Sequence, residues 1–327
     1  MKLNGISHLW RTGLAMATAA LVAAQPAFAG PSIVIDAQSG LVLYSEEAER
    51  PWHPASLTKL MTAYLAFEDI RDGKLSLEDK VVSSPQAVIQ PPSKIGLPVG
   101  AEMRVETALK ALIVKSANDV AVMLAEKMAG SEEAFVARMN ATAKRLGMTG
   151  TTFKNANGLP HPDQVTTAKD MAILGRVLVK EFPDYGDLFA LPSFRLGKRF
   201  LRSHNELLNS FEGADGMKTG FICSSGYNIV TSATRNGRQL IAVVLGATSG
   251  SMRKERAAAL MEYGFEIYGW KSIFSASLNA YSFEKAAWSG PTDISGSTCY
   301  RRRKAGALKK KAIKAKTAKE TSKAPKP

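Results

Sequence analysis

Cysteine and histidine are scarce in this 327-residue chain, which contains two cysteines, Cys223 and Cys299, and four histidines. So few cysteines exclude a disulfide-dense scaffold. The chain has no C-x-x-C pair and its histidines are scattered, which argues against a zinc site, so we expect neither a metal nor another cofactor. The two cysteines can pair with each other or remain free thiols, and the sequence does not choose between these states.

Long hydrophobic runs are also missing. The apolar run at residues 14–24 falls short of the ~20 residues that a membrane-spanning helix needs, which argues against a membrane anchor. It follows the basic residues Lys2 and Arg11 and precedes an A-F-A sequence at 27–29, which matches a cleavage site. We therefore predict that residues 1–29 are a secretory signal peptide and that the protein is exported to the periplasm or cell envelope.

Acidic residues are nearly absent from residues 301–327, where Glu320 stands against twelve lysines and arginines. This segment carries most of the formal net charge of +14, so residues 30–300 are almost neutral. It has too few large apolar side chains to build a core, and we expect a disordered basic tail. The tail is either a solvated extension or a segment weakly attracted to anionic membrane or cell-wall polymers. We do not expect nucleic acid as a partner of an exported protein.

Between these ends the sequence alternates strand-like and helix-like patterns. Apolar residues at helical spacing predict a helix that begins near Ser56, and Asn236-Gly237 separates two β-rich runs as in a hairpin. Strands at both ends with helices between them predict a mixed antiparallel sheet covered by helices, with a helical insertion in the middle. The other expected elements are a hairpin at 32–44, helices at 107–128, 131–146, 167–180 and 251–268, and strands at 227–234 and 239–245.

A serine and a lysine stand three residues apart at the start of the first predicted helix, as Ser56 and Lys59. Three residues span nearly one helical turn, so both side chains lie on the same face. A serine hydroxyl becomes a strong nucleophile only when a base removes its proton. Lys59 can accept that proton only when it is neutral, which requires burial or a nearby cation to lower its pKa from about 10.4. Alone, such a short pattern also fits an ordinary helix start.

Two further polar motifs follow along the chain. Ser116 and Asn118 fall on a turn between two helical segments, where a hydroxyl and an amide can face one cleft, although both residues are also common in plain turns. Lys218 and Thr219 fall on a predicted strand and offer a cation and a hydroxyl to an anionic group. Gly220, which follows them, permits close approach of a ligand to the backbone.

In this order, S-x-x-K, S-x-N and K-T-G resemble the motif set of penicillin-binding proteins and class A β-lactamases. The surrounding sequences, A-S-L-T-K-L-M-T from position 55, N-A-N-G-L from 155 and G-M-K-T-G from 216, resemble the low-molecular-mass D-alanyl-D-alanine carboxypeptidases of peptidase S11 type. The resemblance covers roughly residues 32–270. It implies an α/β (α+β) fold of the β-lactamase/transpeptidase kind, with an antiparallel sheet flanked by helices and a mostly helical subdomain.

This resemblance also implies how the chain is divided. Residues 1–29 are expected to be the signal peptide and residues 30–273 the catalytic domain. Residues 274–300 are expected to form a short C-terminal extension, and residues 301–327 the basic tail.

The implied activity is that of a serine-type carboxypeptidase, which removes the terminal D-alanine from peptidoglycan pentapeptides through an acyl-enzyme on Ser56. Lys59 is implied as the base for acylation. Ser116, linked to Lys218, is implied to carry a proton to the departing D-alanine. β-Lactams are implied as inhibitors that acylate the same serine.

The resemblance assigns binding roles as well. Asn118 is implied to hydrogen-bond the peptide amide, and Lys218 and Thr219 to hold the terminal carboxylate. The backbone N–H of Phe221, together with that of the nucleophile, is implied as the oxyanion hole, beside Gly220. Some relatives use an additional arginine shortly after the strand that follows K-T-G. Here residues 246–250 contain none, so no such role is transferred.

Three alternatives remain open at this point. A D-alanyl endopeptidase that cuts cross-linked peptidoglycan would use the same residues. A β-lactamase needs a carboxylate that activates water, and Glu206 lies too close to Lys218 in sequence to match the class A spacing. A non-catalytic cell-wall-binding protein would retain the fold, but all polar motif residues are present here.

Overall fold

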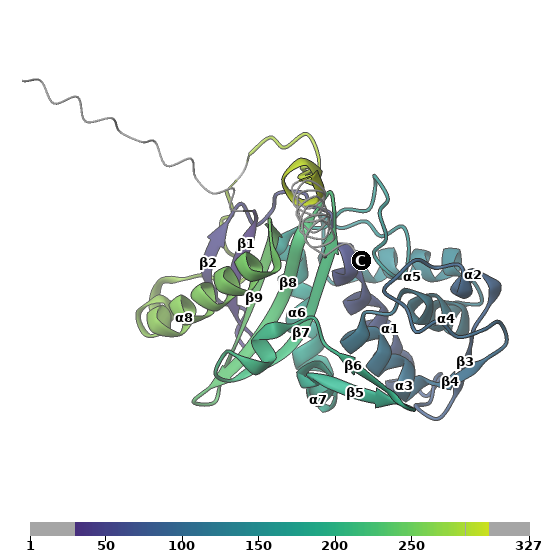
Figure 1. Cartoon of the computed structure of the whole chain (residues 1–327). Coiled ribbons are helices and arrows are strands. Elements are labelled where there is room, and N and C mark those ends of the chain that lie inside the picture. The colour runs from purple at the N-terminus through teal and green to yellow at the C-terminus, as the bar shows by residue number, and fades with distance from the viewer. Residues whose placement is uncertain (1–29, 285, 301–327) are drawn as a thin grey trace, which may run out of the picture.

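A five-stranded antiparallel sheet forms one side of the computed structural model, which describes residues 30–284 and 286–300 (Figure 1). The predicted signal peptide and basic tail lie outside these described residues. The strand order is β2-β1-β9-β8-β7, so the first and last strands in sequence share one sheet. The strands are β1 (Ser32–Asp36), β2 (Val42–Glu46), β7 (Ala214–Ile222), β8 (Gly226–Arg235) and β9 (Arg238–Ala247).

Helices cover both faces of this sheet. Helix α8 (Gly250–Phe274) lies along one face, and α6 (Ala168–Glu181) packs against β1 and β9 from the other. Strand β1 shows why both faces are covered: Ile33 and Ile35 join the main core, whereas Val34 between them belongs to the apolar cluster under α8. Alternate residues of a strand point to opposite faces, so a strand buried on both sides is apolar throughout.

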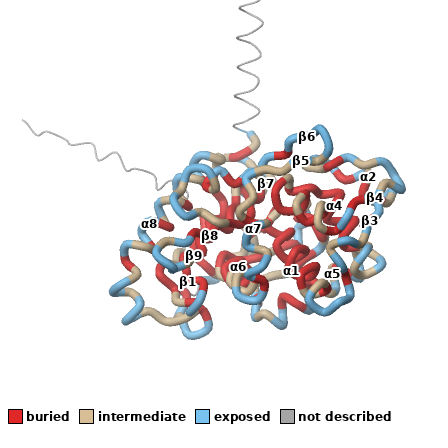
Figure 2. Tube along the Cα trace, turned by 90° about the horizontal axis from the view of Figure 1, so that it is seen from below, coloured by how far each residue is buried: buried red, intermediate tan, exposed pale blue. Residues whose placement is uncertain are grey.

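The other side of the molecule is mostly helical and is inserted between β2 and β7 (Figure 1). Figure 2 shows buried residues running through α1 and α4, where the main core continues from the sheet into these helices. The insertion also carries two small two-stranded sheets, β3-β4 and β5-β6. Its elements are α1 (Lys59–Arg71), β3 (Lys80–Val82), α2 (Pro85–Val88), β4 (Glu102–Arg104), α3 (Val105–Lys110), α4 (Asn118–Ala129), α5 (Glu132–Arg145), α6, α7 (Gly186–Ala190), β5 (Ser193–Leu196) and β6 (Arg199–Arg202).

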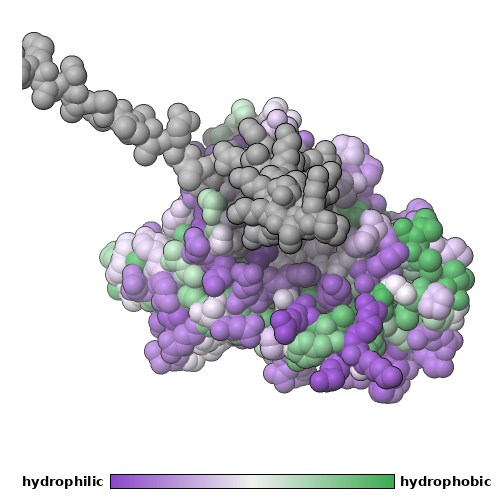
Figure 3. Space-filling model, viewed as in Figure 1, coloured by the Kyte–Doolittle hydropathy of each residue, from purple (hydrophilic) through white to green (hydrophobic). Residues whose placement is uncertain are grey.

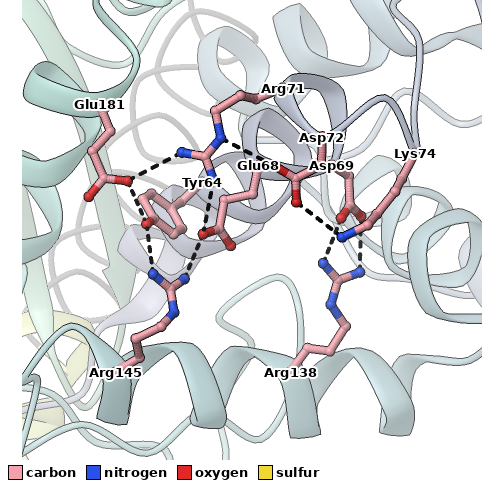
Figure 4. A network of polar contacts seen from close by, with 9 residues as sticks. All are labelled: Tyr64, Glu68, Asp69, Arg71, Asp72, Lys74, Arg138, Arg145 and Glu181. Atoms are coloured by element: carbon pink, nitrogen blue, oxygen red, sulfur yellow. Dashed lines mark hydrogen bonds and ion pairs between the residues drawn. The ribbon is translucent and has the colours of Figure 1, made fainter.

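A charged network holds the C-terminal half of α1 against its neighbours (Figure 4). Arg138 of α5 donates two hydrogen bonds to the buried carboxylate of Asp69, at 2.8 and 3.0 Å. Arg145, two helical turns later, donates to Glu68 at 2.6 Å. A bidentate arginine–carboxylate pair fixes orientation as well as distance. The network therefore fixes the position of the helix that begins with the S-x-x-K motif.

The structure confirms the predicted antiparallel sheet flanked by helices, including the β8–β9 hairpin at Asn236-Gly237. The helix-like stretch at 107–128 is interrupted at Ser116, where the sequence predicts a turn between two helical segments. It consists of α3, a π-helical turn at Ala111–Lys115, and α4, with Ser116 in the left-handed region (φ 59°) between the last two. The β3–β4 pair and the β5–β6 hairpin were not expected, because each strand has only three or four residues.

The segment after α8 folds back onto the body of the protein. Ala276 accepts a hydrogen bond from the backbone of Val42, and Ile294 donates one to Ser224 in the β7–β8 turn. Cys299 forms a disulfide with Cys223 in the same turn, so the pairing left open by the sequence exists. The division at residue 273 stays a prediction. No helix within the described ranges has both the length and the hydrophobicity needed to cross a bilayer.

We expect the double variant Cys223→Ser/Cys299→Ser to lower the free energy of unfolding by about 2–4 kcal/mol, because the disulfide closes a long loop in the unfolded chain. Urea unfolding of the wild type and the variant, each with and without reductant, measures the difference. Reductant should destabilise only the wild type. Equal midpoints for the oxidised wild type and the variant would contradict the expectation.

Candidate active site

Ser56 lies in a 3₁₀ turn, η1 (Ala55–Thr58), that leads directly into α1. The residue before it, Ala55, has φ 48°, which is uncommon for a residue with a side chain. Asn228 of β8 holds the approach to this turn, because its amide nitrogen donates to the carbonyls of His53 and Pro54 at 2.9 and 3.2 Å. The sheet thus fixes the backbone on which Ser56 stands.

Lys59 is fully buried directly beneath the serine. Its amino group donates to Ser56 Oγ at 3.0 Å and to Asn118 Oδ1 at 2.8 Å, and it also contacts the carbonyl oxygen of Asn157. Burial, with a further contribution from the positive charge of Lys218, lowers the pKa of Lys59 well below its usual value. A lowered pKa favours the neutral amine, the form that can accept a proton from a hydroxyl 3.0 Å away.

Two glycines allow neighbouring segments to reach the η1 turn. A Cβ atom on Gly220 of β7 would lie 2.9 Å from the backbone nitrogen of Ser56 and 3.0 Å from the oxygen of Pro54. A Cβ on Gly158, which has φ 85°, would overlap the carbonyl oxygen of Ala55 at 1.9 Å. Only glycine fits at such distances, so both residues are needed for close packing around Ser56.

Ser116 and Lys218 form a second hydroxyl–amine pair. The amino group of Lys218 donates to Ser116 Oγ and to the carbonyl of Thr219, both at 2.9 Å. Burial and the nearby cation Arg253 lower the pKa of Lys218 to about 7. At that value the amine can both donate and accept a proton near neutral pH.

Asn118 connects the two halves of the site. While its Oδ1 accepts from Lys59, its Nδ2 donates to the carbonyl of Pro91 at 2.9 Å. Its backbone N–H donates to Ser93 at 2.7 Å. Asn118 is buried at the first turn of α4, so the amide is held in one orientation by protein groups on both sides.

These residues surround a cavity of about 540 Å³. Ser56, Ser116 and Asn118 reach its surface, whereas Lys59 and Lys218 are buried behind the hydroxyls that they contact. Among the described residues, no group of three or more His, Cys, Asp or Glu side chains is arranged to hold a metal ion. The predicted residues that line the cavity are Ser56, Ser116, Asn118, Thr219, Gly220 and Phe221.

Arg253 of α8 also lines the cavity, although sequence reasoning assigned it no role. It is 6% exposed, and its guanidinium donates to the carbonyl of His204 at 3.0 Å while Nε has no hydrogen-bond partner. The only sequence signal for a role of Arg253 was its position shortly after the strands that follow K-T-G. Arg253 lies in the first turn of α8, which places it beside the cavity that β7 also lines. Sequence reasoning also missed the contact between Lys59 and the Asn157 carbonyl. The N-A-N-G-L sequence indicated a family resemblance but gave no role to any of its residues.

Arg253 is the one lysine or arginine among the described residues that line the cavity, and the Lys218 amine lies buried behind Ser116. His204 also lines the cavity, and desolvation followed by the charges of Lys218, Lys115 and Arg253 lowers the pKa of this imidazole to about 4. Glu206 is the only acidic residue among the described lining residues. The guanidinium of Arg253 is the group of this wall that attracts an anionic ligand.

Comparison with known proteins agrees with this geometry. A family model described as D-alanyl-D-alanine carboxypeptidase, Peptidase_S11, matches residues 18–249. D-alanyl-D-alanine carboxypeptidase DacC of Escherichia coli (strain K12) is 37% identical over 243 residues, which is 72% of this chain and 61% of that protein. The chain therefore spans less than two thirds of the length of this curated relative.

Solved structures give the same result. Penicillin binding protein 5 from Haemophilus influenzae superposes with a TM-score of 0.71 at 32% identity, covering 73% of this chain and 71% of that one. Penicillin-Binding Protein D2 from Listeria monocytogenes, solved in a cefotaxime-bound form, has a TM-score of 0.66 and 33% identity over 72% of this chain and 97% of that one. These likenesses confirm the predicted transpeptidase-like fold.

We expect Gly220→Ala to slow labelling of the protein by a fluorescent β-lactam on the order of 100-fold, because displacing the backbone of Ser56, the predicted nucleophile, by up to about 1 Å spoils its alignment. Gly269→Ala is the matched control, since nothing lies within 4 Å of an added Cβ there. Thermal unfolding verifies that both variants fold. Unchanged labelling of a folded Gly220→Ala protein would contradict the close approach.

The lowered pKa of Lys218 predicts a pH-dependent stability. Between pH about 7 and 10.5 this lysine binds a proton in the unfolded chain but not in the folded one. The free energy of unfolding therefore rises with pH in that window, by up to about 1.4 kcal/mol per pH unit from this group. Urea unfolding should show a flatter pH dependence for Lys218→Met than for the wild type, while the exposed Lys144→Met controls for the loss of a charge. Parallel curves for Lys218→Met and the wild type would contradict the shift.

Proposed function

The chain belongs to the D-alanyl-D-alanine carboxypeptidase family, and on this premise we propose that it removes the terminal D-alanine from peptidoglycan pentapeptides by serine catalysis. The observation that carries the proposal is the fully buried Lys59 amine, 3.0 Å from Ser56 Oγ, with its pKa lowered. A buried amine beside a cavity-facing hydroxyl is an arrangement for proton abstraction. In an ordinary helix start the lysine would be exposed to solvent, and its pKa would not be lowered by burial.

In the proposed first step, Ser56 Oγ attacks the carbonyl carbon of the penultimate D-alanine and its proton passes to Lys59. The oxyanion that forms is stabilised by the backbone N–H groups of Ser56 and Phe221. The close packing at Gly220, where an added Cβ would lie 2.9 Å from Ser56 N, supports this role, because it brings β7 directly beside the nucleophile's amide. The tetrahedral intermediate then collapses to an acyl-enzyme.

The leaving D-alanine needs a proton on its amine. We propose that Ser116 delivers it and is itself reprotonated from Lys218, whose amino group lies 2.9 Å away. Asn118 then binds the substrate's peptide amide from the cavity wall. Water hydrolyses the ester on Ser56 in the last step and releases the shortened peptide.

The terminal carboxylate of the substrate needs cationic and hydroxyl partners. Lys218 and Thr219 are the proposed partners on β7, and Arg253 adds a guanidinium from α8. The unpartnered Nε of Arg253 supports this addition, because a buried polar group without a partner is costly unless a ligand satisfies it. Carboxylate recognition by arginine is strong because the guanidinium presents several donors in one plane.

We further propose that the protein acts outside the cytoplasm, in the periplasm or cell envelope, after removal of residues 1–29. The Cys223–Cys299 disulfide supports this location, since such bonds persist in oxidising compartments. The basic segment 301–327 is proposed to contact anionic membrane or cell-wall polymers weakly, by charge alone.

Ser56 is tested most directly by intact-mass spectrometry after penicillin treatment. We expect a mass increase of one drug molecule on the wild type and none on Ser56→Ala, because only the hydroxyl can form the ester. Ser210→Ala, which removes an exposed hydroxyl elsewhere, is the matched control and should still be acylated. An adduct on Ser56→Ala, or none on the wild type, would overturn the proposed nucleophile and favour a non-catalytic binding protein.

The fate of the acyl-enzyme and the choice of substrate separate the remaining activities. We expect the penicilloyl adduct to persist, and we expect faster D-alanine release from a pentapeptide than cleavage of a cross-linked dimer. Rapid loss of the adduct would instead indicate a β-lactamase. Preferred cleavage of the dimer would indicate an endopeptidase.

A further inference from the structure

The β5–β6 hairpin extends the cavity wall outward as a cationic arm. It carries Arg195, Lys198, Arg199 and Arg202, and no acidic residue occurs between positions 188 and 205. Figure 1 shows the hairpin reaching from the end of β7 toward α3 and β4. Figure 3 shows mainly hydrophilic colour on the part of this face where Figure 1 places β5 and β6.

The inner face of the hairpin anchors it to the rest of the protein. Leu201 is buried, and Phe194 and Leu196 pack against the main core. Arg199 donates a hydrogen bond to the carbonyl of Ile95 at 2.7 Å, across to the helical side. The hairpin is therefore held in place from both sides of the cleft.

The outer face presents an aromatic ring between two guanidinium groups. Arg195 and Phe200 are opposite each other in the strand pairing, and Arg202 lies two residues further on the same face. The guanidinium carbons of Arg195 and Arg202 lie 5.9 and 5.5 Å from the centre of the Phe200 ring. The ring is 52% exposed.

Neither the Arg195 nor the Arg202 side chain makes an ion pair or hydrogen bond within the described parts of the chain, although both stack near the ring. Most other arginines of the described body pair with acids, as Arg138 does with Asp69. Two unpaired guanidinium groups beside an open aromatic face are suited to a ligand with anionic groups and apolar ring faces.

The arm is continuous with the cavity. Strand β6 ends at Arg202, and the next two residues, Ser203 and His204, already line the cavity wall. A substrate peptide whose carboxylate terminus is bound in the cavity has two ways out, and one of them runs along this hairpin. The cations of the arm thus add to the positive charge that Arg253 brings to the cavity wall.

We propose that the outer face of the β5–β6 hairpin is a docking site for the peptidoglycan strand beyond the scissile peptide. The proposal rests on the proposed function and deepens it. Uncross-linked stem peptides each end in a carboxylate, so a polymeric substrate presents several anions that Arg195 and Arg202 bind in fork geometry. Phe200 packs on the apolar face of a sugar ring. A short soluble peptide does not reach the hairpin and gains nothing from it.

The experiment compares two substrates with the full chain. For each protein, kcat/KM is measured with a short peptide ending in D-alanyl-D-alanine and with purified uncross-linked peptidoglycan. We expect Arg195→Gln/Arg202→Gln to lower the polymer-to-peptide ratio about tenfold through a higher KM on the polymer, the effect of two exposed charge contacts. Raising the salt concentration should narrow this difference.

Matched variants keep the test specific. Lys144→Gln/Arg238→Gln removes the same charge from exposed positions, and Arg238 also lies over an aromatic ring, that of Tyr268. This control should keep the wild-type ratio. Arg195→Lys/Arg202→Lys should recover part of it, since charge is restored without the planar fork. The basic tail is present in every protein, so its contribution cancels.

Each remaining outcome has a definite meaning. An unchanged ratio in Arg195→Gln/Arg202→Gln, or an equal fall in the Lys144→Gln/Arg238→Gln control, would overturn the docking site. So would loss of binding to vesicles of phosphatidylcholine and phosphatidylglycerol without loss on peptidoglycan, which would assign the arm to lipid. If the wild type hydrolyses neither substrate, the proposed function fails. Pull-down on insoluble peptidoglycan then still tests the arm, because retention of the wild type but not of Arg195→Gln/Arg202→Gln would support it.

Discussion

The structure depends on the burial of the Lys59 amino group. Removing an ammonium group from water is expensive, and the protein offsets the cost with oxygen acceptors from three separate segments: Ser56 Oγ, Asn118 Oδ1 and the Asn157 carbonyl. None of these contacts can form unless the η1 turn, the start of α4 and the loop around residue 157 converge. The main core, which joins sheet and helices in one apolar cluster, supplies the energy that brings them together. The proposed catalytic arrangement and the fold therefore both depend on the position of the Lys59 amino group.

Backbone conformations of higher energy gather around the same point. Ala55 and Ser116 both have left-handed φ angles, and a π-helical turn precedes Ser116. Residues with side chains adopt such conformations at a cost that the surrounding structure must support. Here the support is visible, because Asn228 holds the chain before Ser56 and Lys218 holds the hydroxyl of Ser116. The two serines of the proposed mechanism are thus presented on stiff, well-anchored turns.

Much of this arrangement could be predicted from the sequence, and the omissions have physical causes. Apolar spacing identified the helix after Ser56, and Asn236-Gly237 identified the last hairpin, because both signals are local. That Ser56, Ser116 and Lys218 share one site was predicted only from the resemblance of the motif set to a known family. Local periodicity carries no information on which distant segments come together. The position of Arg253 in the cavity wall was not predicted, because it depends on where α8 begins in space. The β5–β6 hairpin was missed because each of its strands has only four residues, too few for an alternating pattern to stand out.

The lone disulfide has a consequence for how the protein matures. Because the chain has only two cysteines, it has a single intramolecular pairing, the one between Cys223 and Cys299. Oxidation of a monomer cannot therefore produce a scrambled isomer, and an oxidant suffices without any catalyst of thiol reshuffling. Removal of two electrons per molecule is all that is needed to form this bond.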